Sequence, residues 1–248
     1  MLQIKSFIKT ILIAVRLYPS IYFYPNPFKL FEFNHITKKS KIGKNETILD
    51  IGCGDGLQSV LIAKKCRKFI GIDTSPKSIE QAKRLAKSVG MSDHCQFRCV
   101  RIDKAKFLEN SFDRIFSICV IEHVTDYKAL LSEAYHVLKK NGQFLLSVDS
   151  LASIEDETIK RKHQKDHYVV KYFTVDELRK LLNEIGFQEI SVYPIFRGKL
   201  ARKLFIKGIK NRFRFNHIST IFYYLLLLFN EKFANQKRGI FLVACCKK

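Results

Sequence analysis

Short apolar runs recur from residue 46 to residue 148, and stretches with helical spacing separate them. The runs at 47–51, 68–73 and 112–119 have the length and composition of buried strands. A helix is predicted over residues 129–138, followed by a turn and a strand over residues 140–148. This alternation predicts an α/β fold with a doubly wound parallel sheet.

The pattern continues after residue 148. Residues 175–185 have the apolar spacing of a helix, and Thr174 with Glu177 forms a predicted capping box at its start. Two further apolar runs, 187–193 and 239–244, predict the last two strands. The sequence therefore predicts a helical segment inserted between these strands.

The most specific stretch is 46–56, with the sequence ETILDIGCGDG. Its glycines directly follow a predicted strand, and glycine lets the backbone pass close to a ligand. The N–H groups at the start of the next helix can face a carboxylate or a phosphate. Asp50, at the end of the strand, adds a carboxylate that suits a ligand's ammonium group. The spacing is G-x-G-x-G, whereas the dinucleotide fingerprint is G-x-G-x-x-G.

A second carboxylate follows at a meaningful distance. Asp73 ends the run at 68–73 and lies 23 residues after Asp50. In a βαβ nucleotide site, an acid at about this distance meets the ribose hydroxyls. The two segments together predict a nucleotide-like ligand at the ends of the first two strands.

In this order, these segments resemble the motifs of the class I S-adenosylmethionine-dependent methyltransferases. The resemblance covers about residues 44–196 and the last ten residues. It implies a Rossmann-like seven-stranded sheet whose antiparallel last strand lies between its neighbours, with S-adenosylmethionine as cofactor. Asn141 stands where the family's hairpin has its first glycine. The cofactor-binding residues that the resemblance implies are Asp50, Gly52, Cys53, Gly54, Gly56, Asp73 on the ribose, Thr74 beside the adenine, Asp103 on its amino group, and Cys119.

The Glu-His pair at 122–123, common in this family, supplies the candidate catalytic residue. Methyl transfer from a sulfonium needs no acid, but a hydroxyl acceptor needs a base. His123 is the best candidate because imidazole titrates near neutral pH, and a histidine that orients the loop is the alternative. His163 and His167 are substrate-side candidates on a capping segment, or part of a solvated loop. Similar quinone-biosynthesis O-methyltransferases bind a metal through an additional acid, but this chain has Cys119 there, so no metal is predicted.

Seven cysteines form no C-x-x-C pair and lie mostly in apolar strands. Their odd number and the absence of a secretory signal argue for reduced, buried thiols in the cytoplasm. Metal ligation by them is not expected.

The net charge of +21 lies almost wholly in the flanks. Residues 1–45 hold eight Lys/Arg against one acid, and residues 190–248 hold 13 against one. The predicted division is an N-terminal extension (1–43), a methyltransferase core (44–196), a basic amphipathic helical insertion (197–238) and the final strand (239–248). An enzyme core does not need such charge, so the flanks indicate a location or a partner.

Both flanks are apolar as well as basic. Residues 1–18 fit a helix whose basic residues share a narrow face, followed by an aromatic, proline-containing stretch at 18–28. In residues 199–214, five basic residues form a stripe about 80° wide on a helix, with Leu204, Phe205, Ile209 and Phe213 on the other side. Residues 217–229 are strongly apolar but too short to span a bilayer. Such helices are typical of a membrane interface, although a helix pair packed on the domain and a nucleic-acid surface are alternatives.

We therefore expect O-methylation of a small-molecule, glycan or lipid-linked acceptor, at an anionic membrane surface on the inner face if the flanks bind it. An RNA methyltransferase is the alternative, since phosphate contacts would use the positive charge. The chain lacks the Asn/Asp-Pro-Pro-aromatic motif of amino-group enzymes after residue 118 and a Pro-Cys nucleophile. A non-catalytic cofactor-binding scaffold is the third reading.

Overall fold

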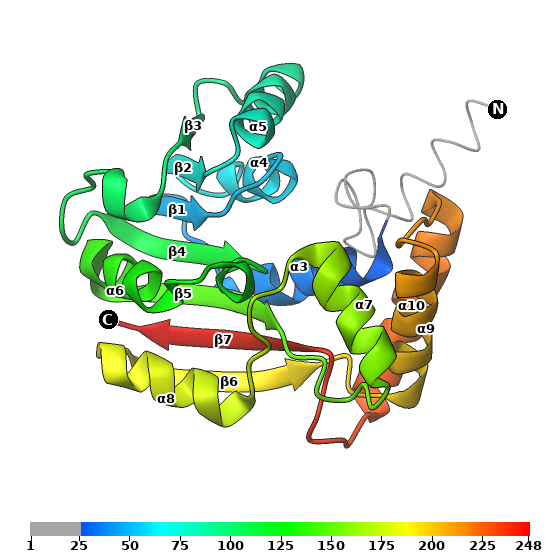
Figure 1. Ribbon diagram of the computed structural model, residues 1–248. Helices are drawn as coiled ribbons and strands as arrows, with labels where there is room; N and C mark the ends of the chain where they lie inside the picture. Colours follow the sequence, from blue (N-terminus) through cyan, green and yellow to red (C-terminus); the bar gives the residue numbers. More distant parts are fainter. Residues whose placement is uncertain (1–25) are drawn as a thin grey trace.

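The computed structural model describes residues 26–248 and contains one seven-stranded sheet with helices on both faces (Figure 1). The predicted helix at 1–18 and most of the aromatic stretch lie outside the described residues. The strands are β1 Thr47–Ile51, β2 Lys68–Asp73, β3 Cys95–Cys99, β4 Phe112–Ile118, β5 Leu138–Asp149, β6 Gln188–Ile195 and β7 Phe241–Lys247.

The strand order is β3-β2-β1-β4-β5-β7-β6. Strands β1 to β5 pair in parallel, and β7 is antiparallel to both β5 and β6. This confirms the predicted doubly wound sheet with an antiparallel last strand between its neighbours. Strands β1 to β3 are added toward one edge of the sheet, and the strands from β4 onward are added on the other side of β1. In such folds, ligands bind in the crevice beyond the carboxyl ends of the strands at this switch point.

Four helices cover the two faces of the sheet between successive strands: α4 Leu57–Ala63, α5 Pro76–Ser88, α6 Tyr127–Val137 and α8 Val175–Ile185. Two short 3₁₀ helices, Ile102–Lys104 and Ile121–His123, follow β3 and β4. The predicted capping box is present, since the Glu177 N–H donates to Thr174 Oγ1 and the Thr174 N–H donates to the Glu177 carboxylate. Asn141 has a φ of 62°, the left-handed geometry that a glycine would adopt there.

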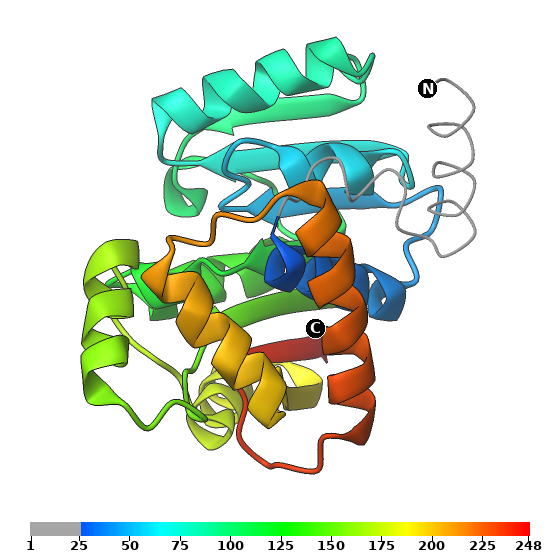
Figure 2. The same cartoon turned by 90° about the vertical axis from the view of Figure 1, so that its right-hand side faces the viewer.

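A second group of helices gathers at the end of the sheet where β1, β4 and β5 finish (Figures 1 and 2). It comprises α3 Pro27–Ser40, α7 Glu157–His167, α9 Lys199–Lys210 and α10 His217–Phe233. Helix α10 packs against α3 and α9, and α7 packs against α9. Phe28 of α3 makes edge-to-face contacts with Phe196 and Phe205, which ties the residues before the core to the insertion after it.

Two expectations for this region are corrected. The apolar side of 199–210 does not face a lipid surface, because Ala201, Phe205 and Ile209 of α9 are buried in the protein core. The lysines of α9 are exposed, as the alternative of a helix packed on the domain predicts. The segment with the two histidines is a helix and not a solvated loop, and His163 on it is buried.

Candidate active site

Two cavities adjoin beyond the carboxyl ends of β1, β2 and β4. The first has a volume of about 450 Å³ and lies toward β2 and β3, and the second has a volume of about 340 Å³ and lies toward α3, α7 and α9. Three residues line both cavities: Gly52, Cys119 and His123. All three are among the site residues predicted from the sequence.

Asp73 joins the glycine turn to the start of α5. Its Oδ2 accepts a hydrogen bond from the Gly54 N–H (2.9 Å), and its Oδ1 accepts one from the Ser75 N–H (2.8 Å). A carboxylate oxygen has two lone pairs, so both oxygens keep capacity for a further donor. Asp73 lines the first cavity, where a ribose diol can supply such donors.

The three glycines of the turn have different roles. Gly52 has a φ of +73°, and a Cβ there would lie 2.4 Å from Cγ2 of Val120. Gly54 has a φ of +54° with open space around the missing side chain, which leaves its backbone accessible in the second cavity. Gly56 lines neither cavity, contrary to its predicted cofactor role. A Cβ there would lie 2.8 Å from the Cβ of Ala82, so the structure gives Gly56 a role in packing α4 against α5.

The rest of the first cavity suits a nucleoside. Thr74 and Asp103 line it as predicted, together with the apolar side chains Ile72, Val100, Ile102 and Leu130. Arg101 Nε donates to Asp103 Oδ1 at 3.0 Å. A carboxylate with free acceptor capacity at one side of an apolar cavity fits the adenosine half of S-adenosylmethionine.

Asp50 lies at the end of β1, buried, and lines the second cavity with Cys53. Ser59 Oγ donates to its Oδ2 at 2.8 Å. Burial raises the pKa of Asp50 to about 7, the Ser59 hydrogen bond opposes this rise, and the nearby Asp73 adds to it. A nearby cation stabilises the charged form of such a buried carboxylate. Asp50 is therefore suited to the role expected for it, which is to bind a ligand's ammonium group.

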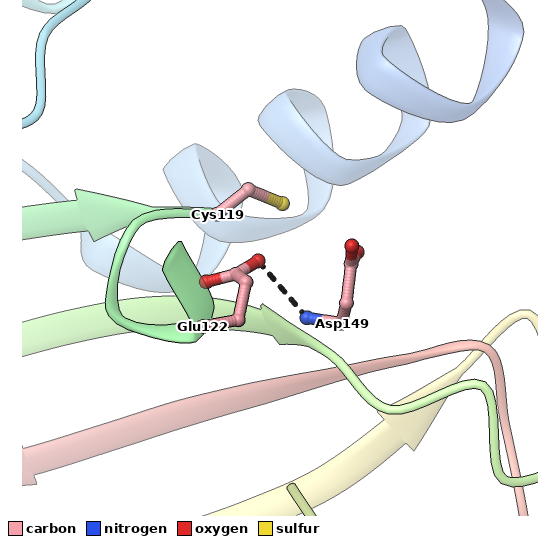
Figure 3. A group of neighbouring side chains, drawn as sticks. All are labelled: Cys119, Glu122 and Asp149. Atoms are coloured by element: carbon pink, nitrogen blue, oxygen red, sulfur yellow. Dashed lines mark hydrogen bonds between the residues drawn. The ribbon is translucent and has the colours of Figure 1, made fainter. Parts of the chain in front are cut away.

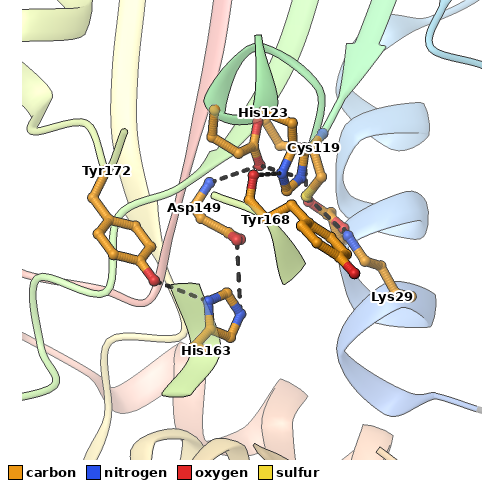
Figure 4. Close-up of polar contacts among 10 residues, drawn as sticks. Lys29, Cys119, His123, Asp149, His163, Tyr168 and Tyr172 are labelled. Atoms are coloured by element: carbon orange, nitrogen blue, oxygen red, sulfur yellow. Dashed lines mark hydrogen bonds and ion pairs between the residues drawn. The ribbon is translucent and has the colours of Figure 1, made fainter. Parts of the chain in front are cut away.

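A lysine on α3 reaches this site (Figure 4). Lys29 Nζ donates to Glu32 Oε2 at 2.9 Å and to Cys119 Sγ at 2.8 Å, and Cys119 Sγ donates to Glu32 Oε1 at 3.1 Å. Burial raises the pKa of the Cys119 thiol well above its usual range, and the Glu32 carboxylate adds to this rise, so the thiol is neutral at pH 7. The three side chains therefore form a closed set of hydrogen bonds that includes one ion pair, between the partly exposed Lys29 and the buried Glu32.

Cys119, Glu122 and Asp149 form a close group (Figure 3). One ligand atom from each lies within 4.8 Å of the others, close enough to hold a metal ion. The Lys29 ammonium, however, already lies against the thiol in this part of the structure. The expectation that no metal binds here stays a prediction.

Glu122 connects three segments of the chain through hydrogen bonds. Its Oε1 accepts from the Asp149 N–H at 3.0 Å, and its carbonyl oxygen accepts from the N–H groups of Val170 and Lys171. Its Oε2 is buried without a hydrogen-bond partner among residues 26–248. Burial and the nearby Asp149 raise the pKa of Glu122 well above its usual range, which favours the protonated form of the carboxyl group. Glu122 thus fixes the loop that carries His123.

His123 lies where the two cavities meet. Its Nδ1 is 3.4 Å from the carbonyl oxygen of Tyr168, which can only accept, so this nitrogen carries the hydrogen. Burial lowers the pKa of His123, and the ring is neutral at pH 7. The lone pair is therefore on Nε2, which lies 4.0 Å from Glu122 Oε1 and can accept a proton.

His163 on α7 faces the second cavity together with Asp149 (Figure 4). The Tyr172 hydroxyl donates to the carbonyl of Lys160, so it accepts from His163 Nδ1 at 3.1 Å. The lone pair of His163 is then on Nε2, which lies 3.7 Å from Asp149 Oδ2. Burial lowers the pKa of His163 to about 3 and raises that of Asp149. The lone pair on His163 Nε2 therefore faces Asp149, and a proton held by the Asp149 carboxyl can be donated to it.

Lys29, Glu32 and Asp149 were not predicted from the sequence to belong to the site. Asp149 directly follows the predicted strand at 140–148, and an acid at the carboxyl end of a parallel strand is a signal that could have identified it. Nothing local distinguishes Lys29 from the other basic residues of the flank.

Comparison with known proteins agrees with this geometry. Residues 42–188 match a family described as "Methyltransferase domain". Sterol 24-C-methyltransferase of Saccharomyces cerevisiae is 31% identical over 164 residues, which cover 62% of this chain and 42% of that protein. A ubiquinone biosynthesis O-methyltransferase of Cereibacter sphaeroides is 30% identical over 58% of this chain and 60% of its own length. The match thus spans only about two-fifths of the length of the sterol methyltransferases.

Solved structures share the fold at low sequence identity. Phosphoethanolamine N-methyltransferase 2 of Haemonchus contortus, in complex with S-adenosyl-L-methionine, superposes with a TM-score of 0.64 at 18% identity, covering 88% of this chain and 52% of that one. Geranyl diphosphate C-methyltransferase of Streptomyces coelicolor superposes with a TM-score of 0.64 at 14% identity, covering 87% and 78%. These relatives methylate carbon, oxygen and nitrogen by name, so the comparison does not select an acceptor atom.

Proposed function

Since this chain belongs to the methyltransferase-domain family, the class I S-adenosylmethionine-dependent methyltransferases, we propose that it methylates a hydroxyl group of a small-molecule or lipid-linked acceptor. The observation that carries the proposal is the meeting of the two cavities at Gly52, Cys119 and His123. One cavity suits a nucleoside, and the other has the polar and aromatic lining of an acceptor site.

The cofactor would lie across the boundary between the cavities. Asp73 would bind the ribose hydroxyls, and Thr74 with Asp103 would lie beside the adenine. Asp50 and the open backbone at Gly54 would receive the amino-acid end. When bound, S-adenosylmethionine supplies a methyl group on a sulfonium centre, which leaves as a neutral thioether.

The remainder of the second cavity would hold the acceptor. Four phenylalanines from three parts of the chain line it: Phe28, Phe205, Phe213 and Phe241. Lys29, Asp149 and His163 add polar groups to the lining. An apolar body with a hydroxyl group fits such a lining, because the rings cover the body and the polar side chains can form hydrogen bonds with the hydroxyl group.

His123 would accept the proton that the hydroxyl loses on methylation. Its neutral ring, the lone pair on Nε2 and its place at the boundary of the cavities support this role. The methyl donor and the acceptor must meet at this boundary, and a base must lie within hydrogen-bond reach of the proton that it removes. The name of the Cereibacter sphaeroides relative supports oxygen as an acceptor atom in this family.

The test begins with the acceptor. Purified protein and S-adenosylmethionine with a labelled methyl group are incubated with membrane and soluble extracts of the source cells, and the labelled product is identified. Label in a hydroxyl-bearing small molecule or lipid supports the proposal. Label in RNA would overturn it in favour of a nucleic-acid methyltransferase.

With the acceptor in hand, His123→Ala should lower turnover by about 10²-fold and leave the affinity for S-adenosylhomocysteine unchanged. His136→Ala is a matched control, because His136 is exposed on α6 and lines neither cavity. Equal losses of affinity and turnover in the His123 variant would show that this histidine only supports the loop.

A further inference from the structure

Helix α10 exposes a continuous row of large apolar side chains. We call this row the α10 stripe. Phe222 is 58% exposed, Phe229 is 66% exposed and Ile218 is 82% exposed. The full stripe consists of Ile218, Phe222, Leu225, Phe229 and Phe233. At 100° per residue, these five positions fall within about 80° of one another.

The orientation of α10 is fixed by its opposite side. Thr220, Tyr224 and Leu227 are buried, and Asn34 Nδ2 of α3 donates to the Tyr224 hydroxyl at 3.2 Å. The stripe is therefore held outward by packing and a hydrogen bond to α3. It is a property of the folded chain and not of a free helix.

Basic residues surround the α10 stripe. Lys207 of α9 lies over the Tyr223 ring at 5.9 Å from its centroid, and Lys232 lies 5.7 Å from that of Phe233. The four lysines of α9 are exposed at positions 199, 203, 207 and 210. The one acid in residues 190–248, Glu231, is bound to Arg197 at 2.7 Å. No other carboxylate side chain of this segment is present to neutralise these basic residues.

We propose that α10 lies flat in the interface of an anionic phospholipid bilayer, with its stripe between the acyl chains and the surrounding basic residues at the headgroups. A helix with an apolar face and basic flanks binds such a surface by apolar burial and by electrostatic attraction. The helix lies in the interface and does not cross it, because none of the helices in residues 26–248 is long and apolar enough to span a membrane.

This docking would bring the acceptor site close to the lipid. Phe205 of α9 and Phe213, which follows α9, both line the second cavity, and α9 packs on α10. An amphiphilic acceptor could then enter from the bilayer surface. The docking itself does not depend on the proposed methyl transfer.

The test is co-sedimentation of the full chain with vesicles of phosphatidylcholine alone and of equal parts phosphatidylcholine and phosphatidylglycerol. Wild type should bind the anionic vesicles and remain in solution with the neutral ones. Phe222→Ser with Phe229→Ser should weaken binding roughly tenfold or more, because two rings lose their burial in the acyl region. Leu108→Ser is the control, since Leu108 is exposed at a site away from α10.

Charge is tested separately. Lys207→Glu with Lys210→Glu should weaken binding at least roughly thirtyfold, whereas Lys83→Glu with Lys87→Glu on α5 should not. Unchanged affinity for S-adenosylhomocysteine would show that each variant is folded. Vesicle binding that is equal in all variants would overturn the proposal. It would also be overturned if the stripe variant turned a dimer into a monomer, which would assign the stripe to a second copy, or if RNA bound in place of vesicles.

Discussion

The conformation of Gly52 gives a prediction whose size follows from the geometry. In Gly52→Ala, the alanine would have to adopt a φ of +73°, and its Cβ would lie 2.4 Å from Val120 Cγ2. The left-handed conformation costs about 1 kcal/mol, and overpacking costs about 1–3 kcal/mol. The variant should thus lose about 3 kcal/mol of unfolding free energy. Gly90→Ala separates the two effects, since Gly90 has a φ of +69° with no atom near the missing Cβ, and should lose about 1 kcal/mol.

The assay is urea unfolding of the two variants, of Val120→Ala and of the double variant. Val120→Ala removes the two methyl groups nearest to the new Cβ and leaves its own Cβ at 3.2 Å. The double variant should consequently be more stable than the sum of the two single effects by about 1 kcal/mol or more. Equal losses for Gly52→Ala and Gly90→Ala, or additive effects in the double variant, would refute the reasoning.

Two further predictions concern buried charge. The pKa of Asp50 is raised from its usual 3.8 to about 7 in the folded protein, so the folded state holds a proton that the unfolded state has lost. Stability should fall as pH rises from about 4 to about 7, and in Asp50→Asn, measured by urea unfolding across this range, the fall should be smaller by up to about 4 kcal/mol. A parallel pH dependence in both proteins would contradict this assignment. Lys29→Met should destabilise the fold by about 3 kcal/mol at pH 7, because Glu32 is fully buried and would lose its cation. The double variant Lys29→Met with Glu32→Met should recover most of this loss in the same assay. No recovery in the double variant would show that packing and not charge is at stake.

The sheet and the cofactor half of the site could be predicted from sequence because their signals are local. A strand, a glycine turn and a helix start are adjacent in the chain, so Asp50, Gly52 and Gly54 necessarily lie close together. Asp73 ends the next strand, and its place beside the glycine turn follows from the pairing of adjacent parallel strands. Gly56 shows the limit of the pattern, because a glycine in the motif can serve helix packing.

The acceptor half could not be predicted in this way. Lys29 meets Cys119 across 90 positions of sequence, and no local pattern encodes that contact. The two flanking helices show the same limit. Phe205 and Phe222 both belong to apolar faces beside basic residues, yet one is buried in the core and the other is exposed. Only the packing of α9 and α10 against α3 decides which face meets solvent.

The claim that the first cavity binds the nucleoside half of the cofactor is tested most directly by calorimetric titration with S-adenosylhomocysteine. Wild type should bind with micromolar affinity, as should Asp93→Asn, whose changed residue is exposed and lines neither cavity. Asp73→Asn should lose roughly tenfold to a hundredfold in affinity, because hydrogen bonds to a charged group contribute about 1.5–3 kcal/mol. Undiminished affinity in Asp73→Asn, or no binding by wild type, would contradict the account.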